Sequence, residues 1–132
     1  MNQLVGTPVA ESCPMKHILV ADDNIAMAAL VARALTGYKV TTAHNGLEAL
    51  VLARTLPNCD LVIADYVMPA LTGAQLATRL RLERPSVKTL LMTGHATQVD
   101  ADAADTDDQL AKPFHVADLR EKVAKLIGRA ES

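Results

Sequence analysis

Aromatic side chains are scarce in this chain of 132 residues, which holds two tyrosines, one phenylalanine and no tryptophan. Proteins that bind single-stranded nucleic acid commonly stack bases on several aromatic rings, so the composition disfavours that class. An excess of positive charge is also missing, because 13 Lys and Arg face 15 Asp and Glu and leave a net charge of −2. Since phosphate backbones are bound through basic surfaces, we expect no nucleic acid partner.

Long apolar runs and an export signal are missing too. The longest apolar stretch, residues 25–34, is interrupted by Arg33 and falls short of the roughly 18–20 residues that span a bilayer. Residues 1–12 contain neither a positive leader nor an apolar segment, so we expect no secretory signal, no membrane partner and a cytoplasmic location. Cysteine is limited to Cys13 and Cys59, which have no metal-ligand spacing, and two free thiols are expected.

What the sequence does contain is an alternation of short apolar runs with helical patterns. Apolar residues make up 50% and charged residues 21%, which is typical of a folded domain and not of a disordered chain. The short β-branched or leucine-rich runs favour strands of a parallel sheet that is covered on both faces. Strands are predicted at residues 17–21, 39–43, 61–64, 87–92 and 109–111.

Between these strands, apolar residues recur at helical spacing. One helix is predicted from Ile25 to Leu35 with Gly37 as its stop, and a second opens at Asn45-Gly46 and closes before Pro57. Further helices are predicted around residues 76–80 with an end before Pro85, at residues 96–106 with a poorer pattern, and at residues 116–127.

Five strands alternating with five helices predict an α/β fold of three layers, a (βα)5 doubly wound parallel sheet with right-handed crossovers. One domain is expected over residues 16–129, with a flexible arm at residues 1–15 and a tail at residues 130–132. In such sheets, ligands bind at the carboxyl ends of the strands. The residues that follow the predicted strands are therefore the candidates for function.

Chemically capable side chains stand at those strand ends. Asp22 and Asp23 follow the first strand, Asp65 the third, Thr93 the fourth and Lys112 the fifth. Any one of these aspartates could be a solvated loop residue, but their joint placement favours a common site. Crowded carboxylates repel each other unless they share a cation, and Mg²⁺ accepts a site with few carboxylates and several waters. The sequence therefore predicts a magnesium site at this edge of the sheet.

Four motifs make the chain similar to the receiver domain of bacterial two-component response regulators, the CheY-like family. The motifs are residues 20–24 (VADDN), 65–69 (DYVMP) with Gly73 following, 92–95 (MTGH) and 111–114 (AKPF). The resemblance covers residues 16–128. It implies a flavodoxin-like, CheY-like sheet of five strands in the order 2-1-3-4-5. In the second motif, Gly73 is expected to supply a positive φ in a turn.

The resemblance also implies the parts of a phosphorylation site. Asp65 would be the phospho-acceptor, taking its phosphoryl group from a phosphohistidine on a sensor histidine kinase or a histidine phosphotransfer protein. Asp23, Asp65 and the backbone carbonyl of Val67 would bind Mg²⁺, while Asp22 would act mainly through a bound water. The remaining contacts would come from the last two strands. Lys112 and Thr93 would each bind a phosphoryl oxygen, and the Lys112–Pro113 peptide would be cis.

On this basis we expect a stand-alone response regulator that signals through protein–protein contacts with an unidentified downstream target. It would be a self-phosphorylating acceptor with slow autodephosphorylation and not a turnover enzyme. The alternative is a receiver-like interaction module that works without phosphate. Two departures from the family favour that alternative, namely Gln109 where family members usually carry Tyr or Phe and the acidic run at residues 100–108.

Two other classes are disfavoured. A nucleotide- or flavin-binding doubly wound protein would need a glycine-rich loop after the first strand, where this chain has Asp22-Asp23-Asn24. A phosphatase with an aspartyl nucleophile generally carries a second acid two residues after the nucleophile, a place taken here by Val67.

Overall fold

A five-stranded parallel sheet forms the centre of the protein, in a computed structural model that describes residues 15–56, 58–94 and 106–129. The strand order is β2-β1-β3-β4-β5, as the family resemblance implied. Every predicted strand is present within two residues of its predicted ends. The strands are β1 (His17–Ala21), β2 (Lys39–Ala43), β3 (Cys59–Asp65), β4 (Lys88–Thr93) and β5 (Asp108–Ala111).

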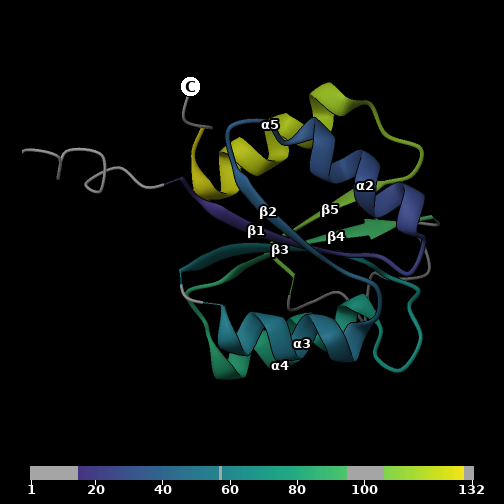
Figure 1. Ribbon diagram of the computed structural model, residues 1–132, viewed down its shortest axis with the longest axis vertical. Coiled ribbons are helices and arrows are strands. Elements are labelled where there is room, and N and C mark those ends of the chain that lie inside the picture. The colour runs from purple at the N-terminus through teal and green to yellow at the C-terminus, as the bar shows by residue number, and fades with distance from the viewer. Residues whose placement is uncertain (1–14, 57, 95–105, 130–132) are drawn as a thin grey trace, which may run out of the picture.

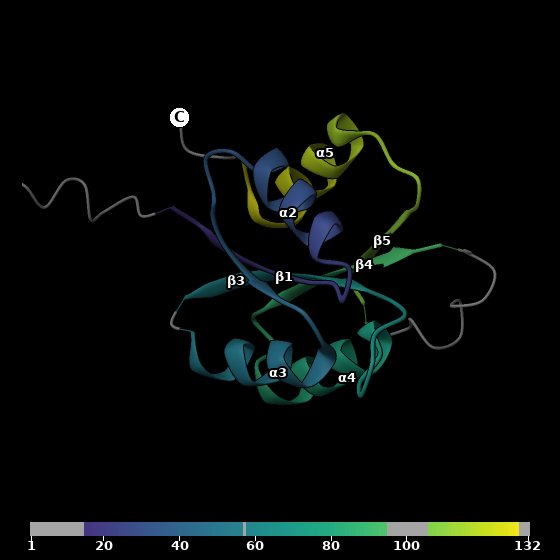
Figure 2. The same cartoon turned by 45° about the vertical axis from the view of Figure 1, so that its right-hand side comes forward.

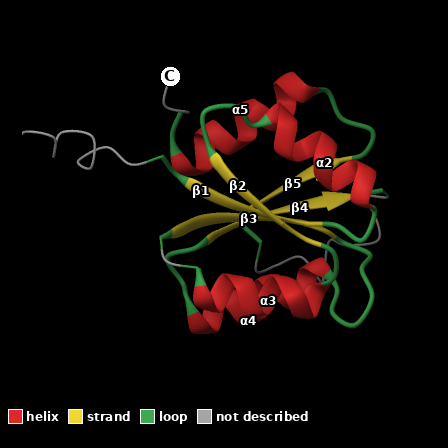
Figure 3. Cartoon of the chain, viewed as in Figure 1, coloured by secondary structure: helices red, strands yellow, loops and turns green. Residues whose placement is uncertain are grey.

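Helices cover both faces of the sheet. Helices α2 (Ile25–Ala34) and α5 (Val116–Ile127) pack on one face, while α3 (Gly46–Thr55) and α4 (Gly73–Glu83) pack on the other, as Figures 1 and 2 show from two directions. Figure 3 shows the resulting three layers, with the yellow strands between two layers of red helices. The helix predicted at residues 96–106 lies outside the described residues except for Thr106, as do residues 1–14 of the arm and the tail.

The central strand β1 shows why both faces are covered. Ile18 and Val20 are fully buried among side chains of α2 and α5, whereas Leu19 and Ala21 are fully buried among side chains of α3 and α4. Successive side chains of a strand point to opposite faces, so a continuous apolar run needs cover on both sides. The core under α3 and α4 contains no aromatic residue, and the core under α2 and α5 is aliphatic apart from Tyr38 and the partly buried Phe114.

Three of the helices begin with a side-chain cap. Each cap residue lies in the segment between the preceding strand and its helix. The side-chain oxygens of Asn24, Asn45 and Thr72 accept backbone N–H bonds at the starts of α2, α3 and α4, at 3.1, 2.8 and 3.1 Å. Such caps satisfy N–H groups that have no partner within the helix. They fix the helix starts at the edge of the sheet where the aspartates lie.

Two predictions about backbone conformation have different outcomes. The Lys112–Pro113 peptide is cis, as the resemblance implied. The prediction of a positive φ at Gly73 is wrong, because Gly73 is the first residue of α4 and the positive φ in this loop, 72°, belongs to Ala70. Gly73 is needed for its size: a Cβ there would lie 2.5 Å from the carbonyl oxygen of Asp65.

In the described part of the chain, no helix combines the length and the apolar character that a membrane crossing requires. Cys59 is buried in β3 as a free thiol, as predicted, and burial raises its pKa. Cys13 lies outside the described residues.

Candidate functional site

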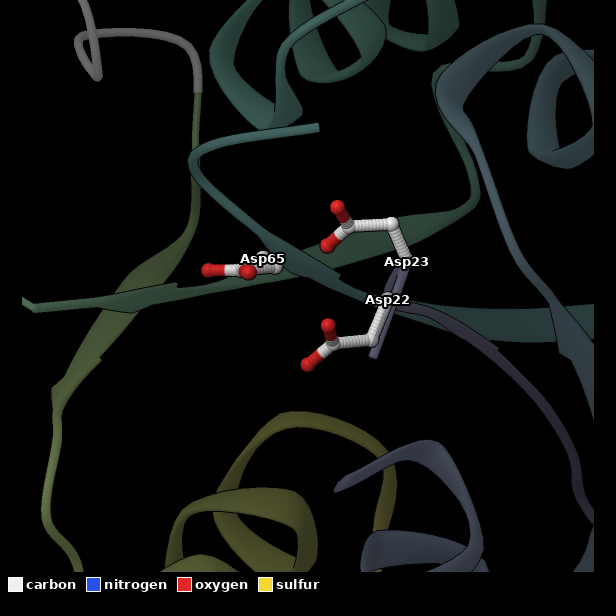
Figure 4. A group of neighbouring side chains, drawn as sticks. All are labelled: Asp22, Asp23 and Asp65. Atoms are coloured by element: carbon white, nitrogen blue, oxygen red, sulfur yellow. The ribbon is translucent and has the colours of Figure 1, made fainter. Parts of the chain in front are cut away.

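Three carboxylates meet at the carboxyl edge of the sheet. Asp22 and Asp23 follow β1 directly, and Asp65 is the last residue of the neighbouring strand β3. One carboxylate oxygen of each residue lies within 4.8 Å of the other two. Figure 4 shows the three carboxylates facing a common space. The structure thus brings together the three aspartates that the sequence placed at strand ends.

An ammonium group completes this cluster. The Nζ atom of Lys112, which follows β5, lies 3.2 Å from Oδ1 of Asp65 and 3.6 Å from Oδ2 of Asp22. The backbone of Lys112 is held by its N–H, which donates to the carbonyl oxygen of Thr93 at 2.7 Å. The lysine therefore links the first, third and fifth strands at one point.

Asp22 is the most deeply buried member of the cluster, with no exposed surface. Its Oδ1 accepts the backbone N–H of Asn24 at 2.9 Å, but its Oδ2 has no hydrogen-bond donor among the described residues. A buried carboxylate oxygen without a donor is costly unless a cation lies nearby. Lys112 at 3.6 Å provides one positive charge, and a metal ion would provide more.

Burial and the neighbouring charges shift the pKa of the Asp65 carboxyl group. Burial raises the pKa of its carboxyl group above the ordinary value, and the negative charge of Asp22 raises it further, with a smaller contribution from Asp23. Lys112 opposes this shift in pKa but does not cancel it. The site therefore holds more negative charge than its own lysine neutralises, and its oxygen ligands are those preferred by a hard divalent cation.

Thr93 and Val67 occupy the segments beside this cluster. Thr93 is the last residue of β4 and is 1% exposed, and it lies one residue beyond Met92, the register partner of Asp65. Val67 lies in the loop after β3, and its side chain is 69% exposed. Both residues are thus on the same edge of the sheet as the aspartates.

Sequence reasoning assigned no role of its own to Asn24. In the structure its backbone N–H donates to Asp22 while its side chain caps α2, so it fixes the aspartate relative to the helix. An Asn directly before an apolar helical pattern is a known cap signal and could have identified this residue.

Comparisons with known proteins identify relatives of this chain. The family model for the response regulator receiver domain matches residues 18–124. This chain belongs to that family. It is 36% identical over 118 residues to the response regulator receiver protein CpdR of Brucella abortus, an alignment that covers 86% of this chain and 98% of CpdR. It is 32% identical to the probable transcriptional regulatory protein TcrX of Mycobacterium tuberculosis, where 98% of this chain matches 54% of TcrX.

Solved receiver structures share the fold. The response regulator TrrA of Thermotoga maritima, determined in complex with Mg²⁺ and BeF, has a TM-score of 0.79 at 36% identity and is covered to 99% by 85% of this chain. A CheY-like receiver domain of Methanospirillum hungatei has a TM-score of 0.77 at 27% identity, with 85% of this chain and 93% of that one covered. The chain thus spans nearly all of some relatives, but only about half the length of TcrX.

Family membership implies phosphoryl acceptance in two-component signalling, by a signalling module and not a turnover enzyme. It also implies contact with histidine kinases or phosphotransfer proteins. Receiver domains bind Mg²⁺ at an acidic pocket, and the three aspartates of this chain form a cluster that could hold such an ion.

Proposed function

We propose that this protein accepts a phosphoryl group on Asp65 from the phosphohistidine of a histidine kinase or phosphotransfer protein. The reaction depends on Mg²⁺, and the phosphorylated protein signals through contacts with other proteins. The observation that carries the proposal is the pairing of three clustered carboxylates with an ammonium, where Nζ of Lys112 lies 3.2 Å from Oδ1 of Asp65. A phosphorylation-independent interaction module would require neither the cluster nor the lysine.

The proposed reaction uses the side chains as follows. A carboxylate oxygen of Asp65 attacks the phosphorus, and the P–N bond to the donor histidine breaks with its electron pair remaining on the imidazole. Lys112 stabilises negative charge on one phosphoryl oxygen, and the hydroxyl of Thr93 donates a hydrogen bond to another. Because the ionised carboxylate has no proton to lose, the attack needs no general base.

The residues present fit a bound Mg²⁺. Asp23, Asp65 and the backbone carbonyl of Val67 would hold the ion directly, and Asp22 would contribute mainly through a water. All of these ligands are oxygen atoms, and Oδ2 of Asp22 is buried without a hydrogen-bond donor in the described part of the chain. When bound, the ion supplies the charge neutralisation that an anionic phosphoryl group needs beside an acidic cluster.

The surface next to the acceptor supports docking of a protein phosphodonor. Helix α2 begins two residues after Asp23, and its exposed residues are Ile25, Ala26, Ala29 and Leu30, followed by Arg33 in the last turn. Ile25 is 67% exposed and Leu30 is 42% exposed. An apolar helix face of this kind is typical of protein–protein contact surfaces and not of a solvated helix.

We assign the receiver domain to residues 16–129, slightly beyond the family match. Lys16 accepts the backbone N–H of Lys39 at 2.9 Å, which ties it to the edge of the sheet. At the other end, the hydroxyl of Tyr38 donates to the carbonyl oxygen of Gly128 at 2.7 Å. These contacts support including both residues in the domain.

The test is intact mass measurement after incubation with acetyl phosphate or phosphoramidate and Mg²⁺. The wild-type protein is expected to gain one phosphoryl group, and Asp65→Asn is expected to gain none. Asp118→Asn, which changes an exposed aspartate in the first turn of α5, is the matched control and should label like wild type. Labelling of Asp65→Asn at the wild-type rate would overturn the assignment, and a wild-type protein that takes up no label would favour the interaction module.

A further inference from the structure

We infer that Gly46, the first residue of α3, is a positioning residue for the loop that follows the phospho-acceptor. This acceptor loop, residues 66–72, contains the Val67 carbonyl expected to bind Mg²⁺, so the inference rests on the proposed function. Gly46 has no side chain and touches no substrate. Its effect comes from the close approach of α3 to the loop.

The acceptor loop is held by two buried side chains. Met68 and Leu71 are 5% and 7% exposed and pack into the core between the sheet and helices α3 and α4. Val67, Pro69 and Ala70 are exposed between and beside these anchors. The loop closes through the N–H of Gly73, which donates to the carbonyl oxygen of Tyr66 at 3.0 Å. Leu71 is therefore one of the two side chains that anchor the loop to the core.

At Leu71 the loop backbone lies directly against α3. A Cβ atom added to Gly46 would lie 2.1 Å from the carbonyl oxygen of Leu71 and 2.5 Å from its Cβ. Real Cβ contacts are essentially never shorter than 3.0 Å. Because these are backbone and Cβ atoms, no change of rotamer relieves the overlap. Either α3 or the acceptor loop would have to move by roughly 1 Å.

The start of α3 is held by hydrogen bonds on both sides of Gly46. Asn45 caps the helix by accepting the N–H of Glu48 at 2.8 Å, and the Glu48 carboxylate accepts the N–H of His44 at 2.8 Å. The strand end before it is tied to the aspartate cluster, because Ala43 accepts the backbone N–H of Asp22 at 3.0 Å.

The loop is held at its ends, where the N–H of Tyr66 donates to the carbonyl oxygen of Met92 at 2.9 Å and Thr72 forms a capping box with Gln75. Between these ends three of its residues are exposed, and Ala70 has a φ of 72°. A positive φ is unfavourable for alanine. An added methyl group at Gly46 therefore displaces the loop and with it the Val67 carbonyl. A displacement of about 1 Å can cost a reaction as much as 100-fold in rate even when its origin is remote from the chemistry.

The test compares Gly46→Ala with wild type in two measurements on the whole protein. Isothermal titration gives the Mg²⁺ dissociation constant, and intact mass with phosphoramidate gives the initial phosphorylation rate. We expect Mg²⁺ binding at least threefold weaker and phosphorylation at least tenfold slower. The matched control is Ala53→Gly, which weakens the same helix at a buried position near its other end and should keep both values within twofold of wild type.

A second variant keeps the inference testable if Gly46→Ala does not fold. Leu71→Val shortens the anchor on the loop side of the same contact and should weaken Mg²⁺ binding at least twofold. Wild-type Mg²⁺ affinity and rate in a folded Gly46→Ala, or in Leu71→Val if the first variant is unfolded, would overturn the inference. Failure of the proposed function is distinguishable, because then the wild-type protein itself would take up no phosphoryl group.

Discussion

At the scale of single residues, the two adjacent aspartates are not equivalent. Asp22 is fully buried, its Oδ1 accepts the N–H of Asn24, and its Oδ2 lies 3.6 Å from Nζ of Lys112. Asp23 is exposed and lies beside the same space. An exposed carboxylate can bind a metal directly with little reorganisation, whereas the buried carboxylate of Asp22 is fixed through Oδ1 by the N–H of Asn24.

This difference predicts unequal effects on metal binding. Asp23→Asn should weaken Mg²⁺ binding about tenfold or more, while Asp22→Asn should weaken it less, because only the first removes a ligand with direct access to the ion. Titration calorimetry of the two variants against wild type provides the comparison. Equal Mg²⁺ affinity for Asp23→Asn and wild type would contradict the ligand assignment.

The identity of residue 67, a valine, leads to a prediction about the lifetime of the phosphoryl group on Asp65. Hydrolysis needs a water in line with the P–O bond, and we expect from the family resemblance that the side chain two residues after the acceptor lies near that path. Valine is apolar and cannot orient a water, so slow loss is expected. Val67→Asn should shorten the half-life of the label several-fold, as measured by intact mass over time.

The side chain of Val67 is 69% exposed, so Val67→Asn should not disturb the packing of the core. The matched control is Asp118→Asn, far from this loop in the sequence, which should leave the half-life unchanged. An unchanged or slower decay of Val67→Asn would count against the idea. His95, which could orient a water instead, lies outside the described residues.

At the scale of elements, local signals predicted most of the fold. Apolar runs predicted the strands, and periodic apolar positions with Asn45 and Gly37 predicted where helices begin and end. Strand β3 was predicted too short, because Asp60 does not resemble a strand residue. In the structure its carboxylate accepts the backbone N–H of His17 on β1, an interaction between residues far apart in the sequence.

For the site too, local sequence signals predicted one part, whereas contacts between distant segments could not be predicted. Polar residues that follow parallel strands must share one edge, so Asp22, Asp65 and Lys112 could be predicted to lie together. The complete burial of Asp22 could not be predicted, because it depends on how segments distant in the sequence pack around the strand end. The size requirements at Gly46 and Gly73 could not be predicted either, since each arises from contact with a distant backbone.

At the scale of the whole molecule, the acidic site lowers the stability of the metal-free fold. The pKa of Asp65 is raised mainly by burial and by Asp22, so its ionised form is less favourable in the folded than in the unfolded chain. Asp65→Asn removes this charge and should raise the free energy of unfolding at pH 7 by roughly 0.5–2 kcal/mol, the common range of a stabilising substitution. Thermal unfolding without Mg²⁺ measures the difference.

The pH dependence follows from the sign of the shift in pKa. A raised pKa in the folded state costs stability only where the carboxyl is ionised, so the advantage of Asp65→Asn should shrink as pH falls and vanish below about pH 4. Saturating Mg²⁺ should reverse the order at pH 7, because a ligand that binds the folded state stabilises it and the variant has lost a ligand oxygen. Asp118→Asn, outside the cluster, should show neither the pH-dependent gain nor the reversal. The contradicting result would be an Asp65→Asn protein that is less stable than wild type without metal at pH 7. In that case the attraction of Asp65 to Lys112 would outweigh the repulsion among the carboxylates. The acidic cluster would then not destabilise the metal-free fold.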